Sequence, residues 1–346
     1  MKIKSQISLL NFIIRRVFIT IPALLGIVTI TFFISRAIPG DPVLHRIPAK
    51  AIGTLYELER QKLGLDQPIF IQYLKFIKLM FTGDWGFSLS VQEDTEVWTL
   101  LMFRLPRSLE VVSISMIIAT ILGIKAGKIA ATNRNKIKDV IIRFIIYILM
   151  AVPGFVVATF FIATFESTGI QLFPFFSYKS IGIGDPPIIT NIRSIDCILS
   201  GNFLMLFDYL YHLFIPICTM IVVQLVIIAR QTRSSMIGVL QMDYIRTAIA
   251  KGLSNKVVFK KHALKNSIPP VITKVTMGFP ALLGAMIPIE VALELKGLGQ
   301  YFAMAMFHLD YSVIIAMIFA YGIIVIIFNL FADILYGYVD PRIRIT

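Results

Sequence analysis

The sequence predicts an all-α integral membrane protein with six transmembrane helices and a folded segment outside the membrane. Of the 346 residues, 57% are hydrophobic and only 15% are charged, which is not the composition of a water-soluble chain. The 27 Phe residues and a mean hydropathy of +0.81 exclude disorder, because disordered segments are poor in aromatic and branched apolar side chains. A net charge of +13 would suggest nucleic acid as a partner of a soluble protein, but here membrane topology explains it.

Six stretches with few charged residues locate the helices that cross the membrane. A helix rises about 1.5 Å per residue, so roughly 20 residues cross about 30 Å of hydrocarbon. Four runs without Asp, Glu, Lys or Arg meet this length, at 17–35, 144–165, 209–229 and 311–332. Two shorter runs, 111–124 and 275–289, reach it if the helix continues past Lys125 and Glu290, whose charged ends can extend to the membrane surface.

These runs divide the chain into four parts. We expect the N-terminus and first span in 1–36, an extracytoplasmic segment in 37–108, the core in 109–336 and a cytoplasmic tail in 337–346. Within the core we expect the second to sixth spans at about 109–131, 143–165, 209–230, 271–293 and 312–336, with a long loop at 231–270.

The distribution of Lys and Arg predicts that both termini are cytoplasmic. Of the 33 Lys and Arg residues, 21 lie on one side, in 1–16, 125–143, 230–274 and 342–346. Nine of the other 12 lie in the long segment from Arg36 to Arg107, where the positive-inside rule is weak. A cleaved signal peptide is the alternative for the first run, but 19 uncharged residues exceed a usual signal core and no small-residue cleavage site follows.

The segment 37–108 is too long for a simple connection, and we expect it to fold because it contains Trp85, Trp98 and apolar residues at helical spacing. An amphipathic helix is predicted over 69–81, and Gly83 is expected to break it. Its apolar stripe is expected to contain Phe70, Leu74, Ile77 and Phe81.

Small residues and prolines interrupt the second and fifth spans. Ala119, Gly123, Gly127 and Ala131 recur every four residues, which favours close helix packing. The alternative is that such segments border a transport path. The candidates for that path are Gly123, Gly127, Gly278, Pro280, Gly284 and Glu290. For Glu290 an ordinary carboxylate at the membrane interface is an equally good interpretation.

The loop at 231–270 is predicted to contain two short helices. The first begins near Met242 and is ended by Gly252 in a left-handed conformation; Ser254 is expected to cap a second helix that ends before the proline pair at 269–270. Small side chains around Ala248 suit insertion into a groove of a cytosolic partner protein. A basic amphipathic helix on the lipid surface is the alternative, but its apolar face would be small.

Several motifs resemble those of a known family. The loop contains Asp-Tyr-Ile-Arg-Thr-Ala at 243–248, Ala-Lys-Gly-Leu at 250–253 and His-Ala-Leu-Lys-Asn at 262–266. Others along the chain are Pro-Gly-Asp-Pro at 39–42, Gly-Leu-Asp-Gln-Pro at 64–68, Gly-Asp-Trp-Gly at 83–86, Leu-Pro-Arg-Ser-Leu-Glu at 105–110, Gly-Leu-Gly at 297–299, Asp-Tyr at 310–311 and Asp-Pro-Arg-Ile-Arg at 340–344. In their order and spacing they resemble permease subunits of ATP-binding-cassette importers, in the branch that handles peptides and nickel. Arg-Thr-Ala at 246–248 departs from the Glu-Ala-Ala of the broader superfamily, as is usual in that branch.

The resemblance implies a type I importer permease fold in a prokaryotic plasma membrane. It implies three kinds of partner: a homologous second permease, two cytosolic ATPase subunits and an extracytoplasmic solute-binding protein. The residues expected to couple this chain to the ATPases are Asp243, Tyr244, Arg246, Thr247, Ala248, Ala250, Lys251, Gly252 and Leu253. No G-x-x-x-x-G-K-[ST] sequence occurs, so Mg-ATP is expected on the partners, and this chain is expected to bind no cofactor or metal and to catalyse no reaction.

The cargo implied by the resemblance is a dipeptide or oligopeptide, with nickel chelates, glutathione and oligosaccharides as alternatives. A secondary transporter working alone is a rival class, but the third, fourth and sixth spans have no titratable group at their centres. A membrane-embedded enzyme is less favoured still, because the four His residues are scattered on both sides without a cluster of carboxylates or thiols.

Overall fold

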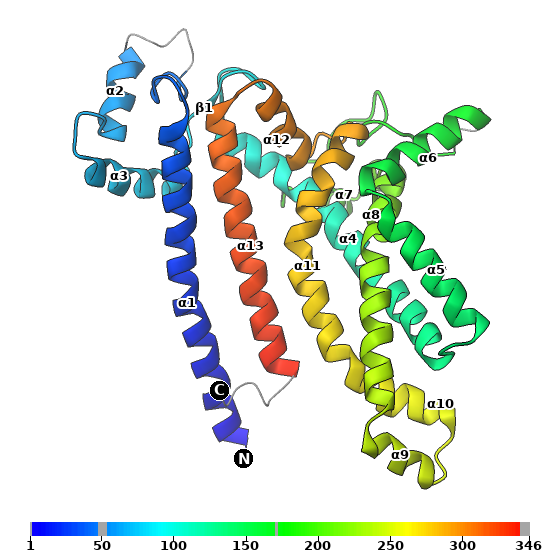
Figure 1. The fold of residues 1–346 in the computed structure, drawn as a ribbon. Coiled ribbons are helices and arrows are strands. Elements are labelled where there is room, and N and C mark those ends of the chain that lie inside the picture. Colours follow the sequence, from blue (N-terminus) through cyan, green and yellow to red (C-terminus); the bar gives the residue numbers. More distant parts are fainter. Residues whose placement is uncertain (1, 48–53, 170–171, 340–346) are drawn as a thin grey trace.

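The computed structural model describes residues 2–47, 54–169 and 172–339. Within these ranges the chain is predominantly helical, with one short two-stranded hairpin. The long helices α1, α13, α11 and α8 run side by side, and α2 and α3 lie at the opposite end of this array from α9 and α10 (Figure 1).

Five helices of the described residues are long and apolar enough to cross a membrane, and a bent pair makes a sixth if it is counted as one span. They are Ile14–Ala37 within α1 (Lys2–Ala37), α4 (Val97–Thr132), α8 (Phe203–Leu240), Asn255–Ala292, which ends with α11 (Lys265–Ala292), and Tyr311–Leu335 within α13 (Tyr311–Val339). In the most apolar window of α8, 56% of the residues are buried, against 17% for α1. Helix α8 is therefore central, and α1 lies at the edge with most of its apolar side chains free to face lipid.

The third expected span is not one helix. The structure breaks it into α5 (Ile137–Ala151) and α6 (Gly154–Thr168), which are bent by 96°. The cause is Pro153, which has no backbone N–H and disfavours helical geometry at the residue before it. Val152 is accordingly extended, with φ −97° and ψ 119°. The prediction of a continuous helix over 143–165 overlooked this proline.

Helices α4 and α8 form the largest packed pair, and two glycines let their backbones approach closely. A methyl group on Gly123 would lie 2.8 Å from the Ile228 side chain, and one on Gly127 would lie 2.6 Å from the carbonyl oxygen of Ala229. The packing interpretation of the four-residue repeat therefore describes what the structure shows at these two positions. Both helices are longer than expected, because α4 already begins at Val97 and α8 continues to Leu240.

The residues between α1 and α4 form α2 (Thr54–Leu63), α3 (Ile69–Thr82) and the hairpin of β1 (Phe87–Ser88) with β2 (Thr95–Glu96). The strands pair antiparallel, with Phe87 opposite Glu96. The predicted helix over 69–81 is confirmed as α3, and Gly83 ends it with φ 77°.

The apolar stripe predicted for α3 is not the side that the structure buries. Its buried side chains are Phe76, Leu79 and Met80, whereas Phe70, Leu74 and Phe81 are about half exposed or more. In a chain surrounded by lipid, an apolar stripe does not have to face the protein interior.

Two further short helices lie in the half of the molecule away from α9 (Figure 1). Helix α7 (Arg193–Leu199) precedes α8, and α12 (Leu298–Phe307) joins α11 to α13.

Candidate functional site: the loop helix and the motif clusters

The short helix α9 (Asp243–Ala250) follows α8 after a tight turn. As predicted, Gly252 ends it in a left-handed conformation, with φ 79°, and its N–H donates to the carbonyl oxygen of Ile249 at 2.9 Å. Ser254 is the N-cap residue of the next element, α10 (Asn255–Val257), but its hydroxyl makes no cap bond. Its carbonyl oxygen accepts the N–H groups of Val257 and Val258 instead.

The second loop helix does not stop at the prolines. After α10 the chain forms a π-helix (Val258–Leu264) and then continues directly as α11, through Pro269 and Pro270, to Ala292. The expected end before 269–270 is therefore corrected. Prolines are tolerated in membrane helices where local adjustments and Ser or Thr side chains satisfy the freed backbone groups, and Ser267 donates to the carbonyl oxygen of Leu264 at 2.8 Å.

Helix α9 buries one side against its own chain. Ile245 and Ala248 are 1% and 7% exposed. They pack in a cluster with Ala131, Met236, Val258 and Ala263. Ala248 is thus in contact with the chain's own loop and not on the outer side of α9, where the sequence had placed it for a partner groove.

The other expected coupling residues are exposed. These are Asp243, Tyr244, Arg246, Thr247, Ala250, Lys251, Gly252 and Leu253. Tyr244 also ties the loop motif at 243–248 to the one at 262–266, because its hydroxyl accepts a hydrogen bond from the Asn266 side chain at 3.2 Å. The result is a short helix with one side fixed to the membrane core and the opposite side open.

A buried ion pair at the base of this loop was missed by sequence reasoning. The Asp139 carboxylate on α5 is fully buried and accepts two hydrogen bonds from the Arg233 guanidinium on α8, at 2.7 and 2.8 Å. It also accepts the backbone N–H of Asn135 at 3.0 Å. Charge-assisted, two-point contacts of this kind fix orientation, so α5 is held to α8 near α9. The sequence signal that could have revealed this ion pair is the scarcity of acidic residues on this side of the chain.

The six path candidates do not converge on one place. Gly123 and Gly127 face α8, and a methyl group on Gly278 would lie 3.0 Å from the Gln224 amide nitrogen. Gly284 is exposed and Pro280 half-buried on α11. Glu290 belongs to a separate cluster.

Glu290 is 1% exposed and joins the motif at 105–110 to the motif at 297–299. Its carboxylate accepts the Ser108 hydroxyl and, at 3.0 Å, the backbone N–H of Gln300. Ser108 in turn accepts the N–H of Leu298 at 2.8 Å. A methyl group on Gly297 would collide with the carboxylate, so glycine is required there. Glu290 is therefore an internal tie between α4, α11 and α12.

A second carboxylate cluster ties the hairpin to the last span. Asp310 is fully buried and accepts the Ser88 hydroxyl at 2.8 Å and the backbone N–H groups of Leu89 and Ser90 at 2.9 and 3.1 Å. The residues of the motif at 310–311 thus meet those that follow the motif at 83–86. Sequence reasoning noted both motifs but not their contact.

The comparisons with known proteins agree with these motifs. Residues 119–345 match the family model described as "Binding-protein-dependent transport system inner membrane component", and residues 9–112 match "Binding-prot-dependent transport system membrane comp, N-term". The chain is 35% identical over 333 residues to the oligopeptide transport system permease protein AppB of Bacillus subtilis, which covers 96% of this chain and 99% of the relative. It is 34% identical over 348 residues to the dipeptide transport system permease protein DppB of Escherichia coli K12, covering 97% and 99% of the two chains.

The chain therefore belongs to the family of inner membrane components of binding-protein-dependent transport systems. It is a multi-pass prokaryotic membrane protein and a transport permease component.

Proposed function

We propose that this chain is the permease subunit of an ATP-driven importer of dipeptides or oligopeptides, and that it forms half of the translocation path. The observation that carries the proposal is the similarity over nearly the whole chain to permeases named for dipeptide and oligopeptide transport. The other half of the path is proposed to come from a homologous permease, with two ATPase subunits that bind Mg-ATP and a solute-binding protein as further partners. This chain supplies no catalytic group, cofactor site or metal site of its own.

The proposed contact with the ATPases is the open side of α9 and the turn that follows it. Thr247, Ala250 and Lys251 are exposed there, beside Arg246, whose side chain is 76% exposed. Because the opposite side of α9 is packed on α8 and the π-helix, a displacement of the ATPases would move the loop and the membrane helices together. Ala248 contributes by holding α9 in place.

The proposed orientation puts both termini and α9 in the cytoplasm and the residues 37–108 on the outside, as a folded segment. The excess of Lys and Arg on the α9 side supports it, with 21 of 33 in the four stretches assigned there. In this arrangement the clusters of Glu290 and Asp310 lie near the outer surface. The proposed domain division is the set of six spans and the loop at 231–270 given above, with the third span bent at Pro153.

Peptide is favoured over nickel chelates, glutathione and oligosaccharides because the relatives described above are named as peptide permeases. The test is uptake by proteoliposomes containing this chain with its own partner subunits and binding protein. ATP-dependent accumulation of a labelled dipeptide or oligopeptide, without accumulation of nickel chelate, glutathione or oligosaccharide, is expected. Uptake that persists without ATP and follows a pH gradient would instead assign the chain to secondary transport.

A further inference from the structure

Arg36 is a cation without a counter-ion. It lies in the last turn of α1, where the span Ile14–Ala37 ends. Among the described residues its guanidinium makes no hydrogen bond or ion pair, and its Nε is buried without a partner. Its contact is with the Phe32 ring, 5.2 Å from the guanidinium carbon. A partly buried charge left unpaired is costly, so an anion bound beside it would be stabilising.

The nearby acidic residues are already engaged elsewhere. Glu59 and Asp84 pair with Arg46 at 3.3 and 3.0 Å, and Lys62 pairs with both. Asp41 accepts the Tyr56 hydroxyl at 2.7 Å and the N–H of Val43 at 2.9 Å. None of these acidic residues pairs with Arg36.

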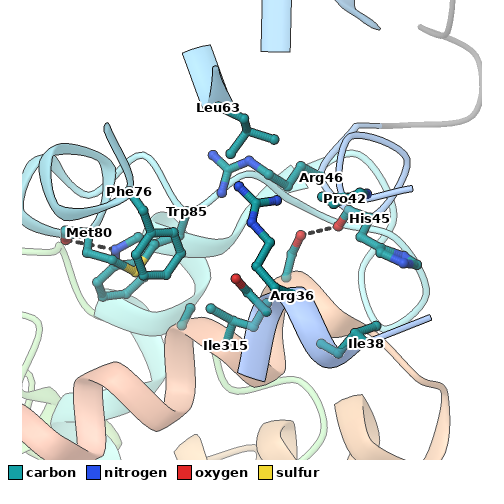
Figure 2. Close-up of a pocket in the computed structure, with 13 residues that line it drawn as sticks. Arg36, Ile38, Pro42, His45, Arg46, Leu63, Phe76, Met80, Trp85 and Ile315 are labelled. Carbon is teal, nitrogen blue, oxygen red and sulfur yellow. Dashed lines mark hydrogen bonds between the residues drawn. The ribbon is translucent and has the colours of Figure 1, made fainter. Parts of the chain in front are cut away.

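Arg36 lines a small recess with a cavity volume of about 30 Å³. Figure 2 shows its side chain pointing toward Arg46, with His45 on one side and the rings of Phe76 and Trp85 on the other. The recess thus combines a cationic end with apolar walls. Such a lining suits an anion attached to an apolar body better than a small hydrated ion.

An apolar groove adjoins the recess. Its walls are Thr29, Phe32, Phe33, Ile69, Phe70 and Tyr73, from α1 and α3. Phe33 and Phe70 are 62% and 66% exposed. Phe32 in the wall of the groove contacts two residues that line the recess: its ring lies 5.2 Å from the Arg36 guanidinium carbon, and its centroid lies 5.4 Å from that of Phe76. A cation at the end of a span and an apolar groove beside it match the headgroup and the acyl chain of a lipid.

We propose that the corner between α1 and α3 is a binding site for an anionic phospholipid of the leaflet distal to α9. The phosphate lies at Arg36, and one acyl chain lies in the groove along Phe33 and Phe70. The site is independent of the transported substrate and of the ATPase contact.

The test uses the assembled importer in mixed micelles with photoreactive lipids that carry a diazirine on the acyl chain. We expect the phosphatidylglycerol probe to label residues 29–36 or 69–73 about tenfold more than the phosphatidylcholine probe at equal concentration. In Arg36→Gln the preference should disappear. Arg60→Gln, which removes an exposed Arg of α2 outside the recess, is the matched control and should retain it.

Further measurements separate the alternatives. Arg36→Gln should melt no lower than wild type in phosphatidylcholine alone, because it removes an unpaired charge, so lost labelling does not reflect unfolding. Equal labelling by both lipids overturns the proposal. Loss of the preference in the presence of inorganic phosphate assigns the recess to a free anion and also overturns it. Labelling of the isolated chain but not of the importer would show that a partner subunit covers the corner, and would also overturn the proposal.

Discussion

Glycine at position 297 has a role that depends on its missing side chain and not on unusual backbone angles. Its φ of −87° is open to any residue, but the Glu290 carboxylate occupies the space that a methyl group would need. The carboxylate has little freedom to move, because it is held by Ser108 and by the backbone of Gln300.

We predict that Gly297→Ala lowers the stability of the purified protein by about 1–3 kcal/mol, the usual cost of overpacking a buried site. The control is Gly284→Ala on α11, where no atom lies within 4 Å of the new methyl group. That change should be neutral or slightly stabilising, since alanine is the better helix former. Thermal unfolding followed by intrinsic fluorescence compares the two; equal midpoints would contradict this account of the Glu290 cluster.

Two Asp–Arg pairs on the α9 side of the molecule, Asp139–Arg233 and Asp243–Arg246, differ in burial, and their energies should differ accordingly. Asp139 is buried and held by Arg233 with two short hydrogen bonds, whereas Asp243 and Arg246 are 3.7 Å apart and largely exposed. We predict that Arg233→Gln lowers the thermal midpoint by several degrees, because it removes both short hydrogen bonds and leaves the buried carboxylate with the more distant Arg143, at 3.5 Å. Arg246→Gln should leave the midpoint unchanged. A thermal midpoint that falls only slightly in both variants would show that water reaches Asp139.

Helix α9 illustrates at the scale of one element why its sequence predicted only part of the site. Its limits follow from local chemistry: an acidic residue in the first turn and Gly252 after the last. The side of α9 that meets the proposed partner does not follow from this local chemistry. That side depends on Met236 and Ala263, residues of other elements that cover Ile245 and Ala248, and no periodicity in an eight-residue helix reveals them.

We therefore predict opposite results for two neighbouring substitutions in α9. Ala250→Glu, on the exposed side, should leave the thermal midpoint of the permease unchanged but reduce ATP-dependent uptake and retention of the ATPase subunits about tenfold or more. Ala248→Glu should lower the midpoint, because it places a charge among buried side chains. Unfolding curves and co-purification measure the two effects. Normal uptake in stable Ala250→Glu would remove the open side of α9 from the ATPase contact.

The same limit applies to the longer elements. The apolar runs predicted where membrane helices lie, because composition alone decides which segments partition into hydrocarbon. The apolar runs did not predict the bend at Pro153, between α5 and α6, because the absence of charge in a run says nothing about the direction of the backbone. The ties from Glu290 to Ser108 and from Asp310 to Ser88 join residues about 180 and 220 positions apart. Motif spacing signalled that these residues matter, but only the fold brings them together.

At the scale of the whole molecule, α9 and the segment that contains α2 and α3 lie at opposite ends (Figure 1). We predict that a cysteine at Arg60 reacts with a membrane-impermeant thiol reagent in intact cells. A cysteine at Lys251 should react only after permeabilisation. Both positions are exposed, and the native Cys197 and Cys218 are first replaced by Ser. The reverse labelling pattern would show that the orientation is the opposite of the one proposed, and that the proposed ATPase contact lies outside the cell.

Helix α8 begins at its Asn202 cap, at the end of the molecule away from α9, and runs to Leu240, with two residues between it and α9. Its 38 residues make a rod about 57 Å long, well beyond the thickness of the hydrocarbon layer. A tilt of about 5° around its centre would carry the two ends about 2 Å in opposite directions. In the proposed transporter, α8 would carry a movement of α9 to the opposite end of the molecule, and Pro216 is the position inside the helix at which it can bend.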